Sequence, residues 1–324
     1  MEFLTESWQG NVMTVRGLLD ADELGITLPH EHLLVRHQGP LVDMVDAQVA
    51  SDELLRFAAY GGKTIVDMTN IGLGRDPLAV QQVSAQSGVN VVLGTGFYKD
   101  AWLPGYVHQM TIGQMAETMV VDIVQGIDGL PIQAGVIGEI GVSRPTTHTE
   151  EKALAAAARA QRATGAAINV HFDIGGKSAE YNHAIDILEA EGADLTRVVL
   201  DHFICRPDEL ELVQQLTSRG CYVEFDLFGQ EMWVKIYELT GNTQPEVQVA
   251  SLYWFIAAGL VERILISQDV GNRVCLRKHG GYGYAHILKN LTPMFHEYGI
   301  TVDHLQTLMV GNPKRLFPFQ KLPS

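Results

Sequence analysis

The stretch Leu28-Pro29-His30-Glu31-His32-Leu33 decides how the rest of the chain is interpreted. Apolar residues lead into it and out of it, which indicates a β-strand. Residues two apart in a strand point to the same face, so His30 and His32 are expected to lie side by side. Two imidazoles on one short strand can hold a divalent metal ion, because neutral histidine is the commonest side-chain ligand of zinc-like ions. Ordinary core or surface histidines are the alternative interpretation.

Seven further apolar runs are similar in kind to that strand. Most are near-continuous and rich in Val and Ile, as expected for parallel strands that are covered on both faces. With the first, the runs are residues 26–35, 64–70, 90–98, 133–141, 166–172, 197–203, 222–229 and 264–270. Eight strands that alternate with helices favour a (β/α)8 barrel, the TIM barrel, in the α/β class. A doubly wound parallel sheet is the alternative.

Helical segments separate the runs, and a glycine closes several of them just before the next strand. These glycines are expected C-caps, at Gly88, Gly165, Gly192 and Gly220. The segment Thr149-Glu150-Glu151-Lys152 opens an alanine-rich helix, with its acidic residues at the positive end of the helix dipole. Because no long linker or charge block divides the chain, residues 1–324 are predicted to form a single barrel domain.

The composition excludes several classes of protein. The 324 residues carry a formal charge of −15, which disfavours nucleic acid or an anionic membrane surface as the main partner. Three scattered cysteines, Cys205, Cys221 and Cys275, fit a reducing compartment better than a disulfide framework. The N-terminal residues show no secretory signal, and the most apolar helical stretch, residues 251–261, is too short to span a bilayer. We therefore expect a cytoplasmic protein.

Polar side chains fall at the same end of different predicted strands. The fourth, fifth, sixth and eighth runs end in or near such residues, namely Glu139, His171, His202 and Asp269. The C-terminal strand ends of a barrel converge on one mouth, where catalytic groups are found. Singly, each residue has an ordinary alternative as a helix cap, a packed core residue or a loop contact. Together with His30 and His32 they predict a metal site, and Asp201 is expected to support that site rather than bind the metal.

These residues, together with Gly94-Thr95-Gly96-Phe97-Tyr98 and Gly311-Asn312-Pro313, resemble the phosphotriesterase-related family of the amidohydrolase superfamily. The resemblance runs over essentially the whole chain. It implies a distorted (β/α)8 barrel with a binuclear metal site at the C-terminal strand ends, holding Zn²⁺ or, as alternatives, Mn²⁺ or Co²⁺. It places His30, His32 and Asp269 on one metal ion and His171 and His202 on the other. A homodimer is a further expectation from the family.

Glu139 occupies the bridging position in this resemblance. Phosphotriesterases proper carry a carboxylated lysine there, whereas a glutamate matches the phosphotriesterase homology protein branch. Both groups present a bidentate monoanion, but the glutamate is shorter and must come from a differently placed backbone. The departure weakens the case for organophosphate hydrolysis.

The two metal ions would supply the nucleophile for hydrolysis. A water shared between two cations about 3.5–4 Å apart ionises near neutral pH, and a metal ion also polarises the carbonyl or phosphoryl oxygen under attack. Asp269 is expected to take the proton from this bridging hydroxide and to pass it to the leaving group. The tyrosine equivalent to Tyr98 lies over the metals in lactonases of the family. Tyr98 is therefore predicted to orient or polarise the substrate, with packing at the barrel rim as the alternative.

Three cations follow Asp269 in a glycine-rich loop, at Arg273, Arg277 and Lys278. A guanidinium group binds phosphate, sulfonate or carboxylate through two parallel hydrogen bonds, and glycine lets the backbone approach a ligand. We therefore expect these residues, Arg273 above all, to bind a small substrate with an anionic tail. Surface ion pairs with acidic residues of a helix are the alternative.

The leading functional interpretation is a hydrolase that opens a small lactone or cleaves a carboxylic ester, with a phosphorylated sugar lactone as one anionic example. An amidohydrolase that removes the acyl group from an N-acylated amino acid or sulfonate fits the same features. Phosphotriester hydrolysis would be a weak side activity. A non-catalytic binding protein on the same frame is the alternative outside enzymes, and the complete set of ligands argues against it.

Overall fold

The computed structural model describes residues 8–36, 39, 42–230 and 244–321. Eight parallel strands form a nearly closed barrel, and each strand pairs with the next one along the chain. The strands are β3 (Ile26–Glu31), β4 (Gly62–Asp67), β5 (Asn90–Thr95), β6 (Val136–Val142), β7 (Ile168–Phe172), β8 (Val198–Leu200), β9 (Tyr222–Phe225) and β10 (Ile264–Ile266). This arrangement confirms the predicted (β/α)8 barrel and excludes the doubly wound sheet.

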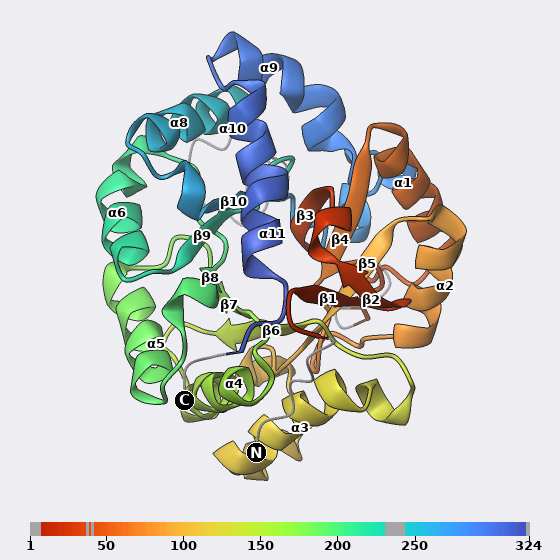
Figure 1. The fold of residues 1–324 in the computed structure, drawn as a ribbon, viewed down its shortest axis with the longest axis vertical. Coiled ribbons are helices and arrows are strands. Elements are labelled where there is room, and N and C mark those ends of the chain that lie inside the picture. Colours follow the sequence, from red (N-terminus) through yellow and green to blue (C-terminus); the bar gives the residue numbers. More distant parts are fainter. Residues whose placement is uncertain (1–7, 37–38, 40–41, 231–243, 322–324) are drawn as a thin grey trace.

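Helices surround the strands in a ring (Figure 1). They are α1 (Ala47–Ala59), α2 (Pro77–Ser87), α3 (Ile112–Val124), α4 (His148–Thr164), α5 (Ser178–Ala190), α6 (Leu210–Ser218), α8 (Pro245–Ala257), α9 (Thr292–Glu297), α10 (Val302–Gln306) and α11 (Asn312–Leu316). Two π-helical turns, Ile287–Leu291 and Thr307–Gly311, precede α9 and α11. None of the described helices combines the length and the apolar content that a membrane span requires.

The predicted helix boundaries are close, with corrections at three helices. The C-caps of α5 and α6 are Glu191 and Arg219, so the expected caps Gly192 and Gly220 each follow the cap by one residue. Gly88 and Gly165 cap α2 and α4 in the left-handed conformation, as predicted. The start of α4 lies earlier than the predicted Thr149, because Thr147 is the N-cap. Its hydroxyl accepts a hydrogen bond from the backbone N–H of Glu150, whose carboxylate accepts one from the backbone N–H of Thr147. This reciprocal capping box fixes the first turn of the helix.

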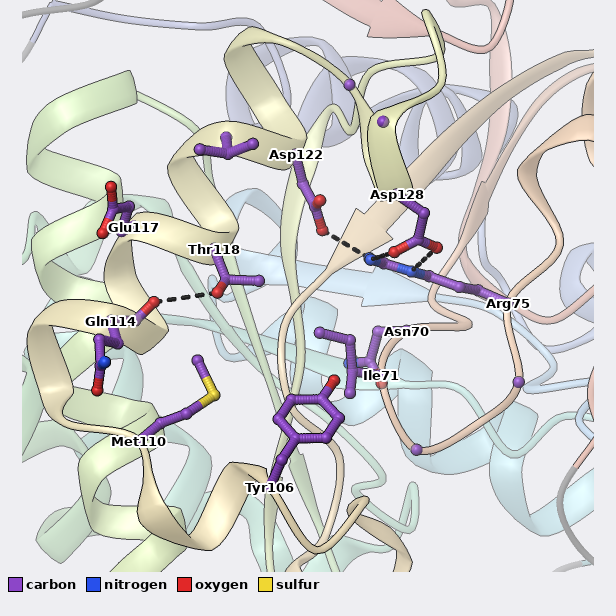
Figure 2. A pocket seen from close by; sticks show the side chains of 15 residues that line it. Asn70, Ile71, Arg75, Tyr106, Met110, Gln114, Glu117, Thr118, Asp122 and Asp128 are labelled. Carbon is purple, nitrogen blue, oxygen red and sulfur yellow. Dashed lines mark hydrogen bonds and ion pairs between the residues drawn. The ribbon is translucent and has the colours of Figure 1, made fainter.

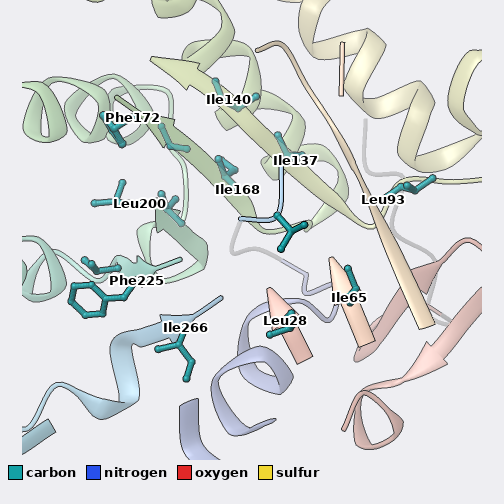
Figure 3. Packing of buried hydrophobic residues seen from close by; sticks show 14 of the residues in the cluster. Leu28, Ile65, Leu93, Ile137, Ile140, Ile168, Phe172, Leu200, Phe225 and Ile266 are labelled. Atoms are coloured by element: carbon teal, nitrogen blue, oxygen red, sulfur yellow. The ribbon is translucent and has the colours of Figure 1, made fainter. Parts of the chain in front are cut away.

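Alternation along the strands divides the buried residues into two layers. One set faces the helices, as Figure 3 shows for Ile65, Ile168 and Leu200. The other set fills the inside of the barrel near the strand starts and contacts the C-terminal residues Leu316 and Phe317. In a strand the next inward positions lie nearer the C-terminal end, and there the inward side chains become polar. The strands therefore carry an apolar floor beneath a polar mouth.

The barrel closes between its first and last strands through hydrogen bonds around His30. The hydroxyl of Ser267, one residue after β10, accepts from the backbone N–H of His30 and lies 2.8 Å from its carbonyl oxygen. The backbone N–H of Asp269 donates to the same carbonyl oxygen over 3.3 Å. The seam of the barrel is therefore also the place where two of the predicted ligands meet.

A short antiparallel hairpin, β1 (Asn11–Thr14) and β2 (Gly17–Asp20), precedes the barrel. The backbone of the C-terminal segment pairs with it, since Phe319 and Asn11 share a hydrogen bond of 2.9 Å. The side chain of Val12 contacts the apolar floor of the barrel. Hairpin and C-terminal segment together cover the end of the barrel that lies opposite the polar mouth.

Candidate metal centre

The two histidines of the opening stretch lie at the end of β3. His30 is fully buried, and its Nε2 atom is 3.7 Å from Oε2 of Glu139. His32 follows the last residue of the strand, and its Nε2 atom is 3.4 Å from Oε1 of Glu139. The hydroxyl of Thr69 fixes the other ring nitrogen of His32 at 3.0 Å. The two histidines thus approach the same carboxylate from one strand, as the sequence pattern predicts.

Glu139 lies in β6 between two groups of histidines. Its Oε2 atom is 2.8 Å from Nδ1 of His171 on β7 and 3.7 Å from Nε2 of His202 after β8. The two ring nitrogens of His171 and His202 are themselves only 2.6 Å apart. One oxygen of Glu139 therefore faces His32 and the other faces His30, His171 and His202, so the carboxylate lies at the centre of the four histidines.

Asp269 completes the group from the loop after β10. Its Oδ1 atom is 3.4 Å from Nε2 of His32 and 3.8 Å from Nε2 of His30. Its side chain is 25% exposed, whereas those of His30 and Glu139 are 0% and 2% exposed. Asp269 is therefore the member of the group that solvent or a substrate can reach. Its φ angle of 46° lies in the left-handed region, which is rare for a residue other than glycine and common at functional sites.

The donor atoms fit a divalent metal ion. Ligand atoms of His30, His32 and Asp269 lie within 4.8 Å of one another, and so do those of His30, Glu139, Asp201 and His202. Nε2 of His30 is buried and has no hydrogen-bond partner among the described residues. Imidazole nitrogens with carboxylate oxygens are the donor set that zinc-like ions take. The cluster could therefore hold a metal ion.

The pKa shifts of the histidines differ in direction. Burial lowers the pKa values of His30 and His202, but neighbouring carboxylates outweigh it and raise both. Burial lowers the pKa of His171 to about 4, although the carboxylate of Glu139 acts in the opposite direction. Burial also disfavours the charged form of Glu139, but His171, His202 and His30 outweigh it and hold the pKa of that carboxyl well below its ordinary value. A neutral imidazole and an ionised carboxylate are the forms that donate lone pairs to a metal.

A layer of buried carboxylates beneath the centre escaped the sequence analysis, apart from Asp201. Asp226 accepts from the backbone N–H of His202 at 3.1 Å and lies 3.0 Å from its Nδ1 atom. Asp201 lies 3.3 Å from Nδ1 of His30, with Glu224 nearby at 3.9 Å. Such partners orient ligating histidines and fix which ring nitrogen faces the metal. The sequence did contain a signal for these acids, because Glu224 and Asp226 are two residues apart in the seventh run and therefore share one face of that strand.

Glu31 is a second residue that the sequence analysis did not single out. It lies between the two histidines in sequence and is fully buried. Its Oε1 atom accepts from the hydroxyl of Ser267 and the backbone N–H of Gln268, and its Oε2 atom accepts from the backbone N–H of Val270, all within 2.9 Å. Glu31 therefore holds the backbone on both sides of Asp269.

Tyr98 lies at the edge of the cluster. Its hydroxyl is 3.5 Å from Nε2 of His171, and the two rings meet edge to face with centroids 4.8 Å apart. The side chain follows the end of β5 and is half-buried. This position is compatible with contact to a substrate at the mouth of the barrel.

The three cations of the loop after Asp269 lie beside helix α1. Lys278 forms an ion pair of 3.3 Å with Asp46, the N-cap of that helix. The backbone N–H of Arg277 donates to Glu53 within the helix. Arg273 is exposed, and its Nε atom is 3.1 Å from the ring of His279. The ion pair with Asp46 matches the alternative interpretation for Lys278, and a substrate contact by any of the three stays a prediction.

A separate cavity of about 600 Å³ lies between α3 and the loop after β4 (Figure 2). Arg75 crosses it and forms ion pairs with Asp122 and Asp128 at 2.6 and 2.8 Å. None of the six predicted metal ligands, all of which are described, lines this cavity. It is linked to the centre by Asn70, whose amide donates to the backbone carbonyl of Glu139, and by Ile71, whose carbonyl accepts from the backbone N–H of Tyr98. We assign the chemistry to the polar mouth of the barrel.

A (β/α)8 barrel whose mouth gathers buried histidines and carboxylates able to hold a metal ion defines a metal-dependent hydrolase. The model of the phosphotriesterase family matches residues 10–317. The chain belongs to the phosphotriesterase family, which confirms the resemblance found in the sequence.

Curated relatives match over nearly the full length of both chains. An N-acetyltaurine hydrolase from Xenopus tropicalis is 33% identical and covers 97% of this chain and 99% of its own. The N-acetyltaurine hydrolase from Dictyostelium discoideum is 31% identical, with 96% and 99% covered.

Solved structures show the same fold. A resiniferatoxin-binding protein from Rhodobacter sphaeroides has a TM-score of 0.88 at 32% identity, with 98% of both chains covered. The phosphotriesterase homology protein from Escherichia coli, solved with phosphate in its active site, has a TM-score of 0.84 at 30% identity, with 91% of this chain and 99% of its own covered. A lactonase from Listeria monocytogenes has a TM-score of 0.84 at 25% identity, with 96% and 100% covered.

Proposed function

We propose that the protein is a binuclear metal-dependent amidohydrolase that cleaves the amide bond of a small N-acylated amino sulfonate or amino acid. The observation that carries the proposal is the central place of Glu139, with one oxygen toward His32 and the other toward His171 and His202. The choice of an amide follows the relatives named N-acetyltaurine hydrolase, which match at up to 33% identity over nearly the whole chain. This places the amidohydrolase interpretation ahead of the lactonase.

The lactonase remains the second candidate. The similarity to the Listeria monocytogenes lactonase favours it, at 25% identity. Lactones, esters and amides share a carbonyl carbon that a water attacks, so one centre can serve all three bonds. The leaving group then decides which substrate is hydrolysed.

Two divalent ions, Zn²⁺ in our proposal with Mn²⁺ or Co²⁺ as alternatives, would occupy the centre. His30, His32, Asp269 and Glu139 would hold one ion. His171, His202 and Glu139 would hold the other. When bound, the ions supply an activated water and a Lewis acid for the carbonyl oxygen.

Asp269 has the position for the proton transfer. It is the most exposed acid of the cluster, so it can meet both the attacking water and the scissile bond. In the proposed reaction its carboxylate takes a proton from the water as the new C–O bond forms, and delivers it to the nitrogen as the C–N bond breaks. Tyr98, beside His171, would orient the acyl group. The products are a carboxylic acid and a free amine.

The proposal includes the cellular compartment and the oligomeric state of the enzyme. All three cysteines are described, buried and free of disulfides, which supports a reducing, cytoplasmic compartment. A homodimer is part of the proposal at the level of the family.

The test is amine release from N-acetyltaurine and N-acetylated amino acids, with proton release from phosphorylated and uncharged lactones measured in parallel on enzyme reconstituted with Zn²⁺ or Mn²⁺. We expect turnover of the N-acyl compounds. Glu139→Ala and Asp269→Asn should each lower kcat by at least about 100-fold. Turnover of lactones alone would replace the amidohydrolase with the lactonase, and full activity in both variants would overturn the two-metal scheme.

A further inference from the structure

Lys99 is a cation at the mouth of the barrel that neither the metal centre nor the catalytic scheme uses. It follows Tyr98 at the end of β5, and its side chain is 21% exposed. Its Nζ atom forms an ion pair of 2.8 Å with Asp173, two residues beyond His171. The same Nζ atom lies 5.6 Å from the centre of the Tyr98 ring. The ring of Tyr98 therefore lies near both the ammonium group of Lys99 and the ring of His171.

The backbone around Lys99 is held from three sides. The N–H of Tyr98 donates to Ile71 at 3.0 Å, and the carbonyl of Phe97 accepts from Gly141 at 3.0 Å. The N–H of Asp100 donates to the buried carboxylate of Glu150 at the start of α4, also at 3.0 Å. A charged side chain on a fixed backbone loses less conformational entropy on binding than one on a loose loop. Lys99 is therefore pre-organised for a ligand.

The backbone also passes very close to the strand that carries Glu139. A Cβ atom added at Gly141 would lie 2.2 Å from the backbone nitrogen of Lys99. Only glycine allows this approach. The backbones of Lys99 and Glu139 are thus tied to one another through two residues of β6, and the barrel sets the position of the Lys99 backbone relative to the centre.

The other described cations near the mouth have different partners. Lys278 pairs with Asp46 beside α1, and Arg144 pairs with Glu180 of α5 at 2.9 Å. Lys99 instead pairs with a residue that leaves the same strand as His171. An ammonium group carries three donors, so the bond to Asp173 leaves two that can meet an anion.

We propose that Lys99 is a specificity residue that binds the anionic end of the leaving group, a sulfonate or a carboxylate, while the acyl end lies over the metal centre. The inference rests on the proposed amidohydrolase function. It assigns the anionic end of the substrate to Lys99, whereas the sequence pattern predicted that the loop of Arg273 binds it. Tyr98 then forms the wall between the two ends of the substrate. Asp173 holds the ammonium group in place before the anion arrives.

The experiment compares a charged and an uncharged substrate of the same length, N-acetyltaurine and N-acetylethanolamine, on metal-loaded enzyme. Lys99→Met should raise KM for N-acetyltaurine at least about tenfold and change kcat/KM for N-acetylethanolamine less than about threefold. Lys99→Arg should restore most of the preference, because it restores the charge. Lys63→Met is the matched control and should leave both substrates unchanged, because Lys63 is exposed at the start of β4, at the end of the barrel opposite the mouth.

Equal losses for both substrates in Lys99→Met would show that Lys99 is only structural. A selective loss of the charged substrate in Arg273→Met, with Lys99→Met unaffected, would move the anion site to the loop after Asp269. If the wild type cleaves neither compound, the amidohydrolase function fails, and thermal shifts with taurine then decide the Lys99 proposal separately. Stabilisation of the wild type by taurine that is lost in Lys99→Met supports the anion site, and equal shifts in both overturn it.

Discussion

At the scale of single residues, Glu139 illustrates how a short side chain can replace a longer bridging group. The pairing of β6 with β7 shifts register between Ile137 and Ile140, directly around Glu139. Gly138 lies so close to β7 that an added Cβ atom would be 2.7 Å from that of Asn169. The irregular strand therefore places the backbone of Glu139 so that its carboxylate reaches both groups of histidines. A glutamate shorter than a carboxylated lysine requires such a displaced backbone, as predicted from the sequence.

His286 gives a prediction about pH. It is buried against the ring of Tyr282 with centroids 4.1 Å apart, and burial lowers its pKa to about 4. The unfolded chain takes up a proton on this histidine below about pH 6.5 that the folded chain refuses until about pH 4. Stability that is present above pH 6.5 is therefore lost as the pH falls through that window. Between pH 7 and pH 5, His286 should account for a loss of about 2 kcal/mol in the free energy of unfolding.

His286→Gln is the variant that tests this contribution. Glutamine does not titrate and can still accept the hydrogen bond that the side chain of Asn290 shares with His286. Urea unfolding at pH 7 and at pH 5 should show a smaller difference for the variant than for the wild type. An identical difference would mean that another group titrates.

Residues of the candidate site divide by whether they belong to the pattern of polar residues at strand ends. Histidines and acids at strand ends could be predicted, because a parallel barrel brings all such ends to one mouth. Lys99 could not be predicted, since its partner Asp173 is 74 residues away and neither residue belongs to a periodic pattern. The role of Glu31 could not be predicted either, because its three donors lie in the segment after β10, at least 236 residues later in the chain.

At the scale of elements, Glu31 joins the end of β3 to the loop that follows β10. Glu31→Gln keeps the size of the side chain but turns one acceptor into an NH₂ donor that faces a backbone N–H. The loop around Asp269 should shift, so kcat should fall at least about tenfold and the protein should lose about 1–3 kcal/mol of stability. Steady-state rates at saturating metal and chemical denaturation measure the two effects.

Ser267→Ala is the control for that variant. It removes one of the three donors to Glu31 and leaves the backbone N–H groups of Gln268 and Val270 paired. Its loss of kcat should be smaller than that of Glu31→Gln. Because Ser267 also bonds the backbone of His30, the outcome that would argue against a loop held by the carboxylate is a loss of kcat below about twofold in Glu31→Gln itself.

Gly165, the C-cap of α4, gives a prediction about the stability of the protein. Gly165 has a φ angle of 72°, and an added Cβ atom would lie 2.0 Å from the carbonyl oxygen of Gln320. Gly165→Ala should therefore cost about 1 kcal/mol for the left-handed backbone and about 1–3 kcal/mol more for the collision. Gly88→Ala is the matched control, because its φ angle is 74° and its Cβ atom would meet nothing within 4 Å. Comparable losses in the two variants would show that the C-terminal segment gives way.

The elements show where sequence patterns stop being informative. The eight predicted strands all exist, but several runs continue past the observed ends, as at His202, which lies beyond β8. Apolar residues go on in these loops because the loops themselves are buried, so hydrophobicity alone cannot mark the last paired residue. The positive φ angles of His202 and Asp269, at 60° and 46°, end the regular strand conformation there. A sequence pattern gives no sign of either angle.

At the scale of the whole molecule, metal binding and stability should be linked. The proposed ligands come from both sides of the seam between β3 and β10, so an ion bound there stabilises the closed barrel over the unfolded chain. Chelation of the metals should therefore lower the thermal midpoint by several degrees, since one site at a hundredfold excess over its Kd contributes about 2.7 kcal/mol. Calorimetry with and without a chelator measures this.

Glu139→Ala should bind less metal and show a smaller shift on chelation, with metal content checked by mass spectrometry. If the wild type unfolds at the same temperature in both conditions, the cluster is not a site for a tightly bound ion. A shift that persists in the variant would place the metal elsewhere.

The closure of the barrel at His30 also sets an order of events during synthesis. The backbone N–H of His30 bonds to Ser267, 237 residues later in the chain. The ribosome therefore releases His30 and His32 long before Asp269 exists, and a nascent chain carries only part of the coordination sphere. A chain that stops before β10 lacks both the seam and the acid that completes the proposed site. The full set of proposed ligands thus exists only after translation has passed Asp269.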